Sequence, residues 1–372
     1  MYYFLFVYSI VFALIFHNHY VRQLKTVNNL PIPTTTTRKR TRKQRGLMLW
    51  CLILAFPFIY LSTLRDYSIG TDTNGTYKLI YYTGYAVHKW KVPLYESLYI
   101  YFVKLMYAVN SDYRFLLFAT SAVISIGFIA YFLKRAKELN TSVCLCGFIV
   151  LIFCFSLNGQ RQVLAMTMAL LFFDYLESKR PFYALIVLIL IAFVHVTGLV
   201  LGIYFIPYFF KDRKNAQKII PALFFVAPVL LPLIIYFVSR ISIFSRFQRY
   251  INAFDIQSIN TKYFVFPLLM LPLIMLYWDK LIRLRENNFL HMCGYIFTFS
   301  AILLSGYLWY AFRILYYFAP SEIIIISQLE KCCKKKHKLI INAYIALSLI
   351  VYFIFVYVMH DTDEIYPYIL AK

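Results

Sequence analysis

Apolar stretches of about 15–20 residues recur along the whole chain and are separated by short charged segments. In a bilayer only a helix or a closed barrel satisfies its own backbone hydrogen bonds, and stretches of this length suit helices. Hydrophobic residues make up 62% of the 372 positions and charged residues 15%. This is too little polar surface for a soluble domain. The sequence therefore predicts an all-α, polytopic integral membrane protein, with residues 1–372 forming a single membrane domain.

The net charge of +22 lies in short loops between apolar stretches. Lysine and arginine concentrate in the cytoplasmic loops of membrane proteins, so this charge reports topology and argues against a nucleic-acid partner. The seven cysteines lie beside or within apolar stretches or in the basic run 331–338, and no paired-cysteine zinc spacing or HExxH motif occurs. We therefore expect no metal and no other cofactor.

Two strongly basic segments, residues 18–46 and 331–338, determine the predicted orientation. Both are expected to be cytoplasmic loops. Threading the apolar stretches between them predicts about 12 transmembrane helices, with both termini outside the cell. Residues 65–112 and 239–262 then become external loops.

Two segments depart from simple transmembrane helices. Residues 94–111 are interrupted by Glu96 and Lys104, so they are expected to form an external amphipathic or re-entrant helix. Residues 182–210 are too long for one ordinary span. They are predicted to form two short helices that turn near His195.

This topology brings the unusual polar residues to the external face. Arginines are disfavoured there by the charge bias, so they call for an explanation. Arginine donates two parallel hydrogen bonds and stays charged when desolvated, which suits a phosphate or pyrophosphate ligand. Arg161 and Gln162 stand out because they begin a helix inside an apolar hairpin. The full set is Arg65, Asp66, Asp72, Glu96, Asn158, Arg161, Gln162, His195, Arg246, Arg249 and Arg313.

Most of these residues also have an ordinary structural explanation, although Arg161 and Gln162 are harder to explain in this way. Arg65, Asp66 and Arg313 lie near helix ends, where they can pair or anchor a helix at the interface. Asp72 and Asn158 can be turn residues. Glu96 can be a charge at a helix start that faces water, and His195 can be a packed histidine. Arg246 and Arg249 can contact lipid headgroups.

The order of these residues resembles a known family. Residues 65–77 read R-x(4)-G-T-D-T-x(3)-Y, and residues 158–165 read N-x-x-R-Q-x-x-A. An acidic residue before an aromatic-rich stretch, a histidine that ends a helix, a basic-aromatic segment and an R-x-x-Y-x-F motif complete the series at Glu96, His195, Arg246–Tyr250 and Arg313–Phe318. Over residues 47–330, their order and spacing are similar to those of EpsG-type polysaccharide polymerases, which are Wzy-like.

The resemblance implies a GT-C-like membrane glycosyltransferase in the bacterial cytoplasmic (inner) membrane. Its implied activity is to join undecaprenyl-pyrophosphate-linked repeat units at the outer face, in exopolysaccharide, capsule or O-antigen synthesis. The implied partners are the lipid-linked oligosaccharide, membrane lipids, a flippase and a chain-length regulator. No nucleotide sugar is needed.

Residue roles follow from this implied chemistry. Arginine would oppose the charge that develops on the pyrophosphate leaving group, and a carboxylate or histidine would take the proton of the acceptor hydroxyl. The predicted catalytic residues are Arg161, His195, Asp72 and Glu96. The predicted substrate-binding residues are Arg65, Asn158, Gln162, Arg246, Arg249, Arg313 and Tyr316.

Other membrane functions stay open. A lipid-carrier ligase or another membrane glycosyltransferase would use the same chemistry. A flippase or transporter would more often show internal repeats and charges near the midplane, which are not evident here. A sugar acyltransferase would need fewer arginines than this chain carries.

Overall fold

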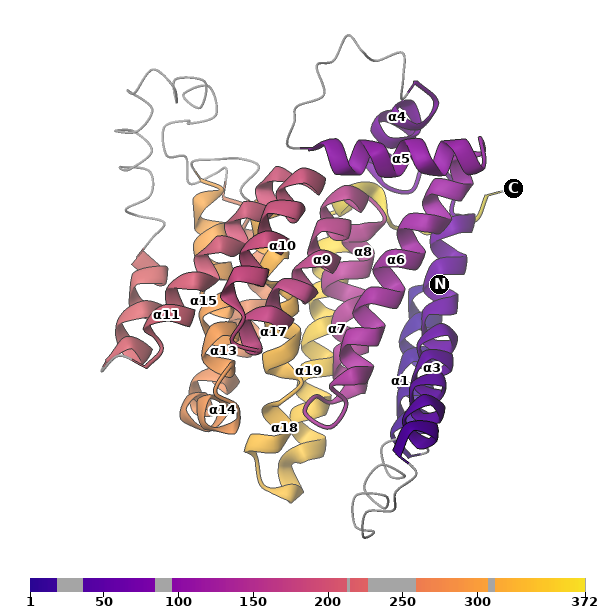
Figure 1. The fold of residues 1–372 in the computed structure, drawn as a ribbon. Helices are drawn as coiled ribbons and strands as arrows, with labels where there is room; N and C mark the ends of the chain where they lie inside the picture. Colours follow the sequence, from indigo (N-terminus) through magenta and orange to yellow (C-terminus); the bar gives the residue numbers. More distant parts are fainter. Residues whose placement is uncertain (19–35, 84–95, 213–214, 227–258, 307–311, 372) are drawn as a thin grey trace, which may run out of the picture.

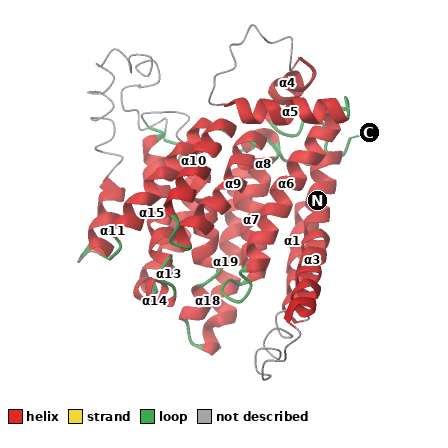
Figure 2. Cartoon of the chain, in the orientation of Figure 1, coloured by secondary structure: helices red, strands yellow, loops and turns green. Residues whose placement is uncertain are grey.

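The computed structural model describes residues 1–18, 36–83, 96–212, 215–226, 259–306 and 312–371 as a bundle of helices (Figures 1 and 2). The described residues contain no strand beyond an isolated antiparallel bridge between Arg65 and Leu370. The all-helical prediction is confirmed. The helices follow in this order: α1 (Tyr2–Phe16), α3 (Thr36–Leu64), α4 (Lys78–Thr83), α5 (Ser97–Val109), α6 (Tyr113–Lys134), α7 (Thr141–Phe148), α8 (Cys154–Ser156), α9 (Gln160–Glu177), α10 (Pro181–Val194), α11 (Phe205–Phe210), α13 (Val265–Leu276), α14 (Trp278–Leu284), α15 (Asn288–Leu304), α16 (Phe312–Leu315), α17 (Ala319–Ile326), α18 (Leu329–Cys332) and α19 (Lys338–Phe353).

Three described helices are long and apolar enough to cross a membrane: Arg45–Leu64, Tyr113–Lys134 and Lys335–Met359. A fourth span results if α13 and α14, which are bent by 78° at their junction, are counted as one. The described residues also form further apolar helices of 10–17 residues, one of them α5. The chain is thus a helical membrane protein, while the number of about 12 spans stays a prediction.

Several predicted helix boundaries agree with the structure. The predicted hairpin tip at 158–161 overlaps the turn between α8 and α9, whose first residues are Gln160 and Arg161, and α10 ends at Val194. His195 is extended (φ −157°, ψ 115°), and residues Val196–Tyr204 continue as a 3₁₀ helix, which confirms the predicted turn. The apolar span Arg45–Leu64 agrees with the predicted second helix, while α3 itself begins earlier, at Thr36, inside the basic segment 18–46. Arginine, lysine and glutamine are good helix formers, so the helix extends beyond its apolar part.

Helix α5 lies across one end of the bundle rather than through it (Figure 1). It packs against α6 and α10, burying Tyr99 and Val103. The π-helical turn Thr73–Tyr77 and α4 lie at the same end. Asp112 caps α6 there, accepting a hydrogen bond from the Arg114 amide at 2.9 Å.

The C-terminal tail, residues 360–371, reaches the same end after α19 and the π-helical turn Ile354–Met359. Its backbone pairs with the end of α3: the Asp66 amide donates to the Ile369 carbonyl, and the Ala371 amide to the Leu64 carbonyl, both at 2.9 Å. The sequence carried no signal for this pairing.

A second polar network extends into the bundle from the opposite end, so the buried polar residues do not all gather at one face as expected. His291 lies 2.8 Å from a Glu177 carboxylate oxygen and 2.9 Å from the Ser321 hydroxyl. Arg135 and Arg285 each pair with Glu177 at 3.1 Å. These residues are far apart in the sequence, and their charges compensate one another, which is how buried charges are normally tolerated.

Candidate functional site

Six of the predicted site residues come together where α5, the α8–α9 turn and the end of α10 meet. We call this group the polar cluster; it consists of Asp72, Glu96, Asn158, Arg161, His195 and Arg313. The elements that supply it are separated by up to 241 residues along the chain, so the grouping is a tertiary arrangement.

Glu96 joins two of the predicted catalytic residues. Its carboxylate accepts a hydrogen bond from Arg161 Nη1 at 2.7 Å, and its other oxygen lies 3.5 Å from His195 Nδ1. The side chains of Arg161, Glu96 and His195 are 23%, 16% and 12% exposed, so they are accessible but largely shielded from water. His195 Nδ1 and Arg161 Nε have no hydrogen-bond partner among the described residues. Glu96 therefore links the guanidinium of Arg161 to the imidazole of His195.

The charge state of Glu96 follows from these contacts. Burial alone would raise the pKa of its carboxyl group. The adjacent His195 ring and the Arg161 guanidinium outweigh burial and hold the pKa below its usual value. Glu96 is therefore a carboxylate at neutral pH.

Aromatic rings surround Arg161. Its guanidinium lies 5.7 Å from the centroid of the Tyr99 ring, within range of a cation–π interaction. Tyr77 is buried beside it. Tyr317, one residue beyond the predicted Tyr316, accepts a hydrogen bond at 3.4 Å from the hydroxyl of Thr197, which follows His195 closely in the chain.

The loop of residues 70–73 is held against the α8–α9 turn by Asn158. The Asn158 side-chain oxygen accepts from the Asp72 amide at 2.7 Å and from the Thr71 hydroxyl at 3.1 Å. Gly70 has φ +88°, and a Cβ there would lie 2.4 Å from the Leu157 carbonyl oxygen. Asn158 is itself buried. Its main effect in this structure is to position Asp72.

Asp72 and Arg313 form the most open pair of the cluster, with 3.7 Å between a carboxylate oxygen and Nη2. Both side chains are partly exposed. Gln162 is buried and donates to the Arg313 backbone carbonyl at 2.5 Å, so it fixes where this arginine emerges.

Arg65 and Tyr316 are both buried, and their predicted contact with the substrate stays a prediction. Arg65 donates to the hydroxyls of Ser62 at 3.0 Å and Thr73 at 3.3 Å. No ion pair of Arg65 occurs within the described part of the chain. The Tyr316 ring stacks on Phe155 at a centroid distance of 3.7 Å. Arg246 and Arg249 lie outside the described residues.

The structure adds Asp363 of the C-terminal tail to the site. Its carboxylate accepts a hydrogen bond from the Asn158 side-chain amide at 2.6 Å. Burial raises the pKa of Asp363 above its usual value, although Asn158 and the nearby Arg313 and Lys262 act in the opposite direction. The tail reads as an ordinary polar terminus, so only the fold could reveal this contact.

The described residues contain no group of three or more His, Cys, Asp or Glu side chains arranged to hold a metal ion. The cluster instead combines arginines, carboxylates, one histidine and tyrosines. This donor set suits an anionic, hydroxyl-rich ligand.

A family model of the EpsG family matches residues 48–370, nearly the whole chain. The chain belongs to the EpsG family. Membership of the EpsG family indicates an exopolysaccharide-associated membrane polymerase. The polar cluster lies entirely within the matched residues. A comparison with curated proteins and one with solved structures found no match.

Proposed function

We propose that this EpsG-family protein is a glycosyltransferase that joins undecaprenyl-pyrophosphate-linked oligosaccharide repeat units at the outer face of the bacterial cytoplasmic membrane. The product would be an exopolysaccharide, capsule or O-antigen chain. The observation that carries the proposal is the contact of Glu96 with both Arg161 and His195, beside the Asp72–Arg313 pair.

The proposed orientation places the polar cluster outside the cell. Basic residues 331–338 contain the 3₁₀ turn Lys335–His337, which lies beside α18 at the end of the bundle opposite α5 (Figure 1). If that end faces the cytoplasm, as the charge bias predicts, the cluster faces outward. About 12 spans would then alternate between the two faces.

The proposed reaction needs no cofactor and no nucleotide sugar. A hydroxyl oxygen of the incoming repeat unit bonds to the anomeric carbon of the growing chain. The bond from that carbon to the pyrophosphate breaks, and its electron pair leaves with undecaprenyl pyrophosphate. The hydroxyl proton passes to a base.

Five of the six residues of the cluster have a role in this step. Arg161 and Arg313 would oppose the charge that develops on the departing pyrophosphate, and such preorganised charge is usually a large share of catalysis. His195 is our choice of base, because Glu96 lies beside Nδ1 and would leave Nε2 to accept the proton. Asp72 would contact sugar hydroxyls from its exposed position beside Arg313.

The same geometry bears on the alternatives. A transporter would be expected to keep its ligand-binding charges near the middle of the bundle. The polar cluster lies at one end, beneath α5 and the tail. A ligase shares this chemistry and differs from a polymerase in the acceptor it uses, so the products must distinguish the two.

Substitution of Arg161 tests the proposal. Arg161→Gln should lower polymer formation at least about 100-fold, the scale of losing one donor to a developing anion. Arg161→Lys should also be strongly impaired, since lysine lacks the planar fork. The readout is the chain-length distribution of lipid-linked glycan in a deletion strain expressing each variant, with the protein abundance measured in parallel.

Arg283, an exposed arginine in the last turn of α14, provides the matched control. Arg283→Gln should leave the chain length unchanged. Accumulation of single repeat units in Arg161→Gln supports a polymerase, whereas intact long chains retained on the carrier would indicate a ligase. Normal polymer at normal abundance would remove Arg161 from the mechanism.

A further inference from the structure

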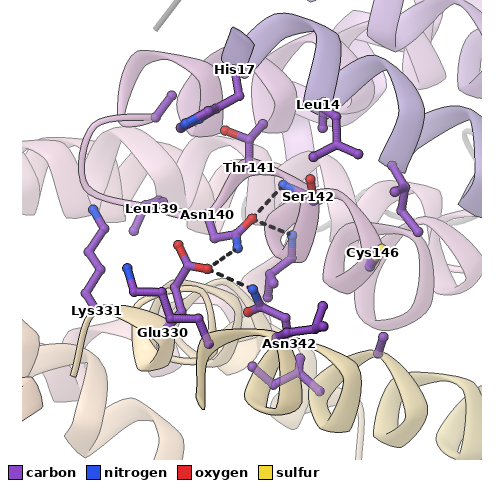
Figure 3. Close-up of a pocket in the computed structure, with 18 of the residues that line it drawn as sticks. Leu14, His17, Leu139, Asn140, Thr141, Ser142, Cys146, Glu330, Lys331 and Asn342 are labelled. Atoms are coloured by element: carbon purple, nitrogen blue, oxygen red, sulfur yellow. Dashed lines mark hydrogen bonds between the residues drawn. The ribbon is translucent and has the colours of Figure 1, made fainter. Parts of the chain in front are cut away.

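A cavity of about 730 Å³ lies near the opposite end of the bundle from the polar cluster. Helix α1, the 136–143 turn with the start of α7, and the segment from Glu330 into α19 enclose it (Figure 3). Its volume falls within the roughly 300–1,000 Å³ typical of small-molecule sites. None of the residues proposed for glycan transfer lines this cavity.

Most of the cavity wall is apolar. Ile10, Val143, Ile345 and Leu349 are among the side chains that line it. At its edge Leu339 is 80% exposed, and Leu14 is exposed as well. Exposed leucines beside an apolar wall suit contact with hydrocarbon, so this part of the cavity fits an acyl chain.

The other part of the lining is basic. Lys137, Lys331 and Lys338 line it, and Lys331 is held by a hydrogen bond from its Nζ to the Lys137 carbonyl at 2.6 Å. Glu330 is the one acidic residue among the described lining residues. Three ammonium groups against one carboxylate leave an excess of positive charge.

The Glu330 carboxylate is already engaged. The same oxygen accepts from Asn140 Nδ2 at 2.9 Å and from Asn342 Nδ2 at 2.8 Å, so the two amides bracket it (Figure 3). In contrast, the buried Thr141 hydroxyl and the Asn342 side-chain oxygen have no hydrogen-bond partner among the described residues. Both residues line the cavity, so its wall has polar as well as apolar side chains beside the three lysines.

We propose that this cavity binds one anionic phospholipid. Its acyl chain would occupy the slot between α1 and α19, and its phosphate would lie among Lys137, Lys331 and Lys338. Basic pockets between transmembrane helices bind anionic headgroups in this way. In the proposed orientation the site faces the cytoplasmic leaflet. A zwitterionic lipid would add a positive group beside the three lysines, so the site selects against it.

Binding is measured by native mass spectrometry of the full-length, detergent-purified protein with added phosphatidylglycerol or phosphatidylcholine. Phosphatidylglycerol should bind in a saturable 1:1 complex and raise the Tm, because a ligand of the folded state stabilises it. The double variant Lys137→Gln/Lys338→Gln should raise the apparent Kd for phosphatidylglycerol about 30-fold, since each lysine near an anionic lipid contributes about fivefold.

The same basic segment offers a charge-matched control. Lys335 and Lys336 are exposed and do not line the cavity. Lys335→Gln/Lys336→Gln removes the same charge and should bind phosphatidylglycerol as wild type does. A cavity-filling variant, Ala346→Phe, should lose the complex while keeping every lysine. If that variant does not fold, the two lysine pairs decide the test.

Three results would overturn the proposal. One is equal affinity for phosphatidylglycerol and phosphatidylcholine. Another is an equal loss of binding in both lysine pairs, which would mean general attraction to a basic surface. The third is a complex that forms with a polyprenyl phosphate but not with phosphatidylglycerol. All three leave the proposed polymerase activity untouched, because the cavity and the polar cluster share no residue.

Discussion

Gly70 shows how closely one residue can control the polar cluster. Its φ of +88° lies in the left-handed region that favours glycine, and the Leu157 carbonyl leaves no space for a side chain. The residue places Thr71, Asp72 and Thr73 against the α8–α9 turn. A change at Gly70 must therefore move Asp72, although Gly70 itself contacts no substrate.

Alanine at Gly70 should lower the Tm by several degrees and reduce polymer formation, because strained backbone of this kind costs about 1–3 kcal/mol before the clash with Leu157 is added. The measurement is thermal unfolding of the purified variant together with the chain-length distribution. Gly75, five residues along the same segment, serves as the control, because a Cβ added there would have no atom within 4 Å. Gly75→Ala should be neutral or slightly stabilising. Equal effects at both positions would contradict this account.

At the scale of residues, the sequence was enough to select members of the polar cluster but not to predict their side-chain partners. Arg161, Glu96 and His195 were selected from charge and motif order, and the fold brings them together. Asn158 and Gln162 were predicted to bind substrate, which stays a prediction. The structure adds their contacts with residues 71–72 and with the Arg313 backbone, which the sequence did not indicate. Side-chain partners depend on tertiary geometry, which a pattern of residue types does not contain.

At the scale of elements, helix α1 contacts the C-terminal tail. The hydroxyl of Tyr2, at the start of α1, donates to the Ile365 carbonyl of the tail at 2.8 Å. The tail in turn contacts Asn158 through Asp363 and pairs with α3. Helix α1 thus helps to hold the segment that borders the polar cluster.

Removal of this hydroxyl in Tyr2→Phe should leave the Ile365 carbonyl without its buried partner and destabilise the tail by about 1 kcal/mol or more. Carboxypeptidase should then trim the tail several-fold faster, which mass spectrometry can follow over time. Tyr3, 73% exposed, is the matched control, and Tyr3→Phe should be trimmed at the wild-type rate. Unchanged trimming of Tyr2→Phe would show that the tail is held by other contacts.

Helix positions were more predictable than helix ends. Hydropathy located the apolar cores of the helices. Residues 182–210 are too long for a single span, and this predicted the break at His195. The early start of α3 at Thr36 was missed, since charge was read as a loop signal although arginine and lysine favour helices. The tail pairing was missed because it depends on backbone groups that carry no residue signature.

At the scale of the whole molecule, the two ends of the bundle carry different sets of polar and charged residues. The polar cluster lies beneath α5 and the tail, whereas the Glu177–His291 network and the basic segment 331–338 lie toward the other end. The sequence missed the second network because His291 and Glu177 are 114 residues apart. The orientation could be predicted from the sequence, because the charge bias depends only on where lysines and arginines lie in the loops.

Orientation can be tested by cysteine labelling in intact cells. Six native cysteines are buried and only Cys333 is partly exposed. The variant Cys333→Ser therefore has no exposed native thiol that could react with the reagent. In that background Gly75→Cys, beside the polar cluster, should react with a membrane-impermeant maleimide. Lys336→Cys, in the basic segment, should react only after permeabilisation. Both positions are exposed, so differences in access report the side of the membrane.

The labelling pattern also constrains the number of spans. Opposite sides for residues 75 and 336 require an odd number of crossings between them, as the predicted alternation of helices does. Labelling of both from outside would require an even number, and the polar cluster and the lipid cavity would then have to share a face. That result would contradict the orientation, because residues 331–338 would carry their lysines outside against the charge bias. The family assignment, which rests on residues 48–370, would stand in either case.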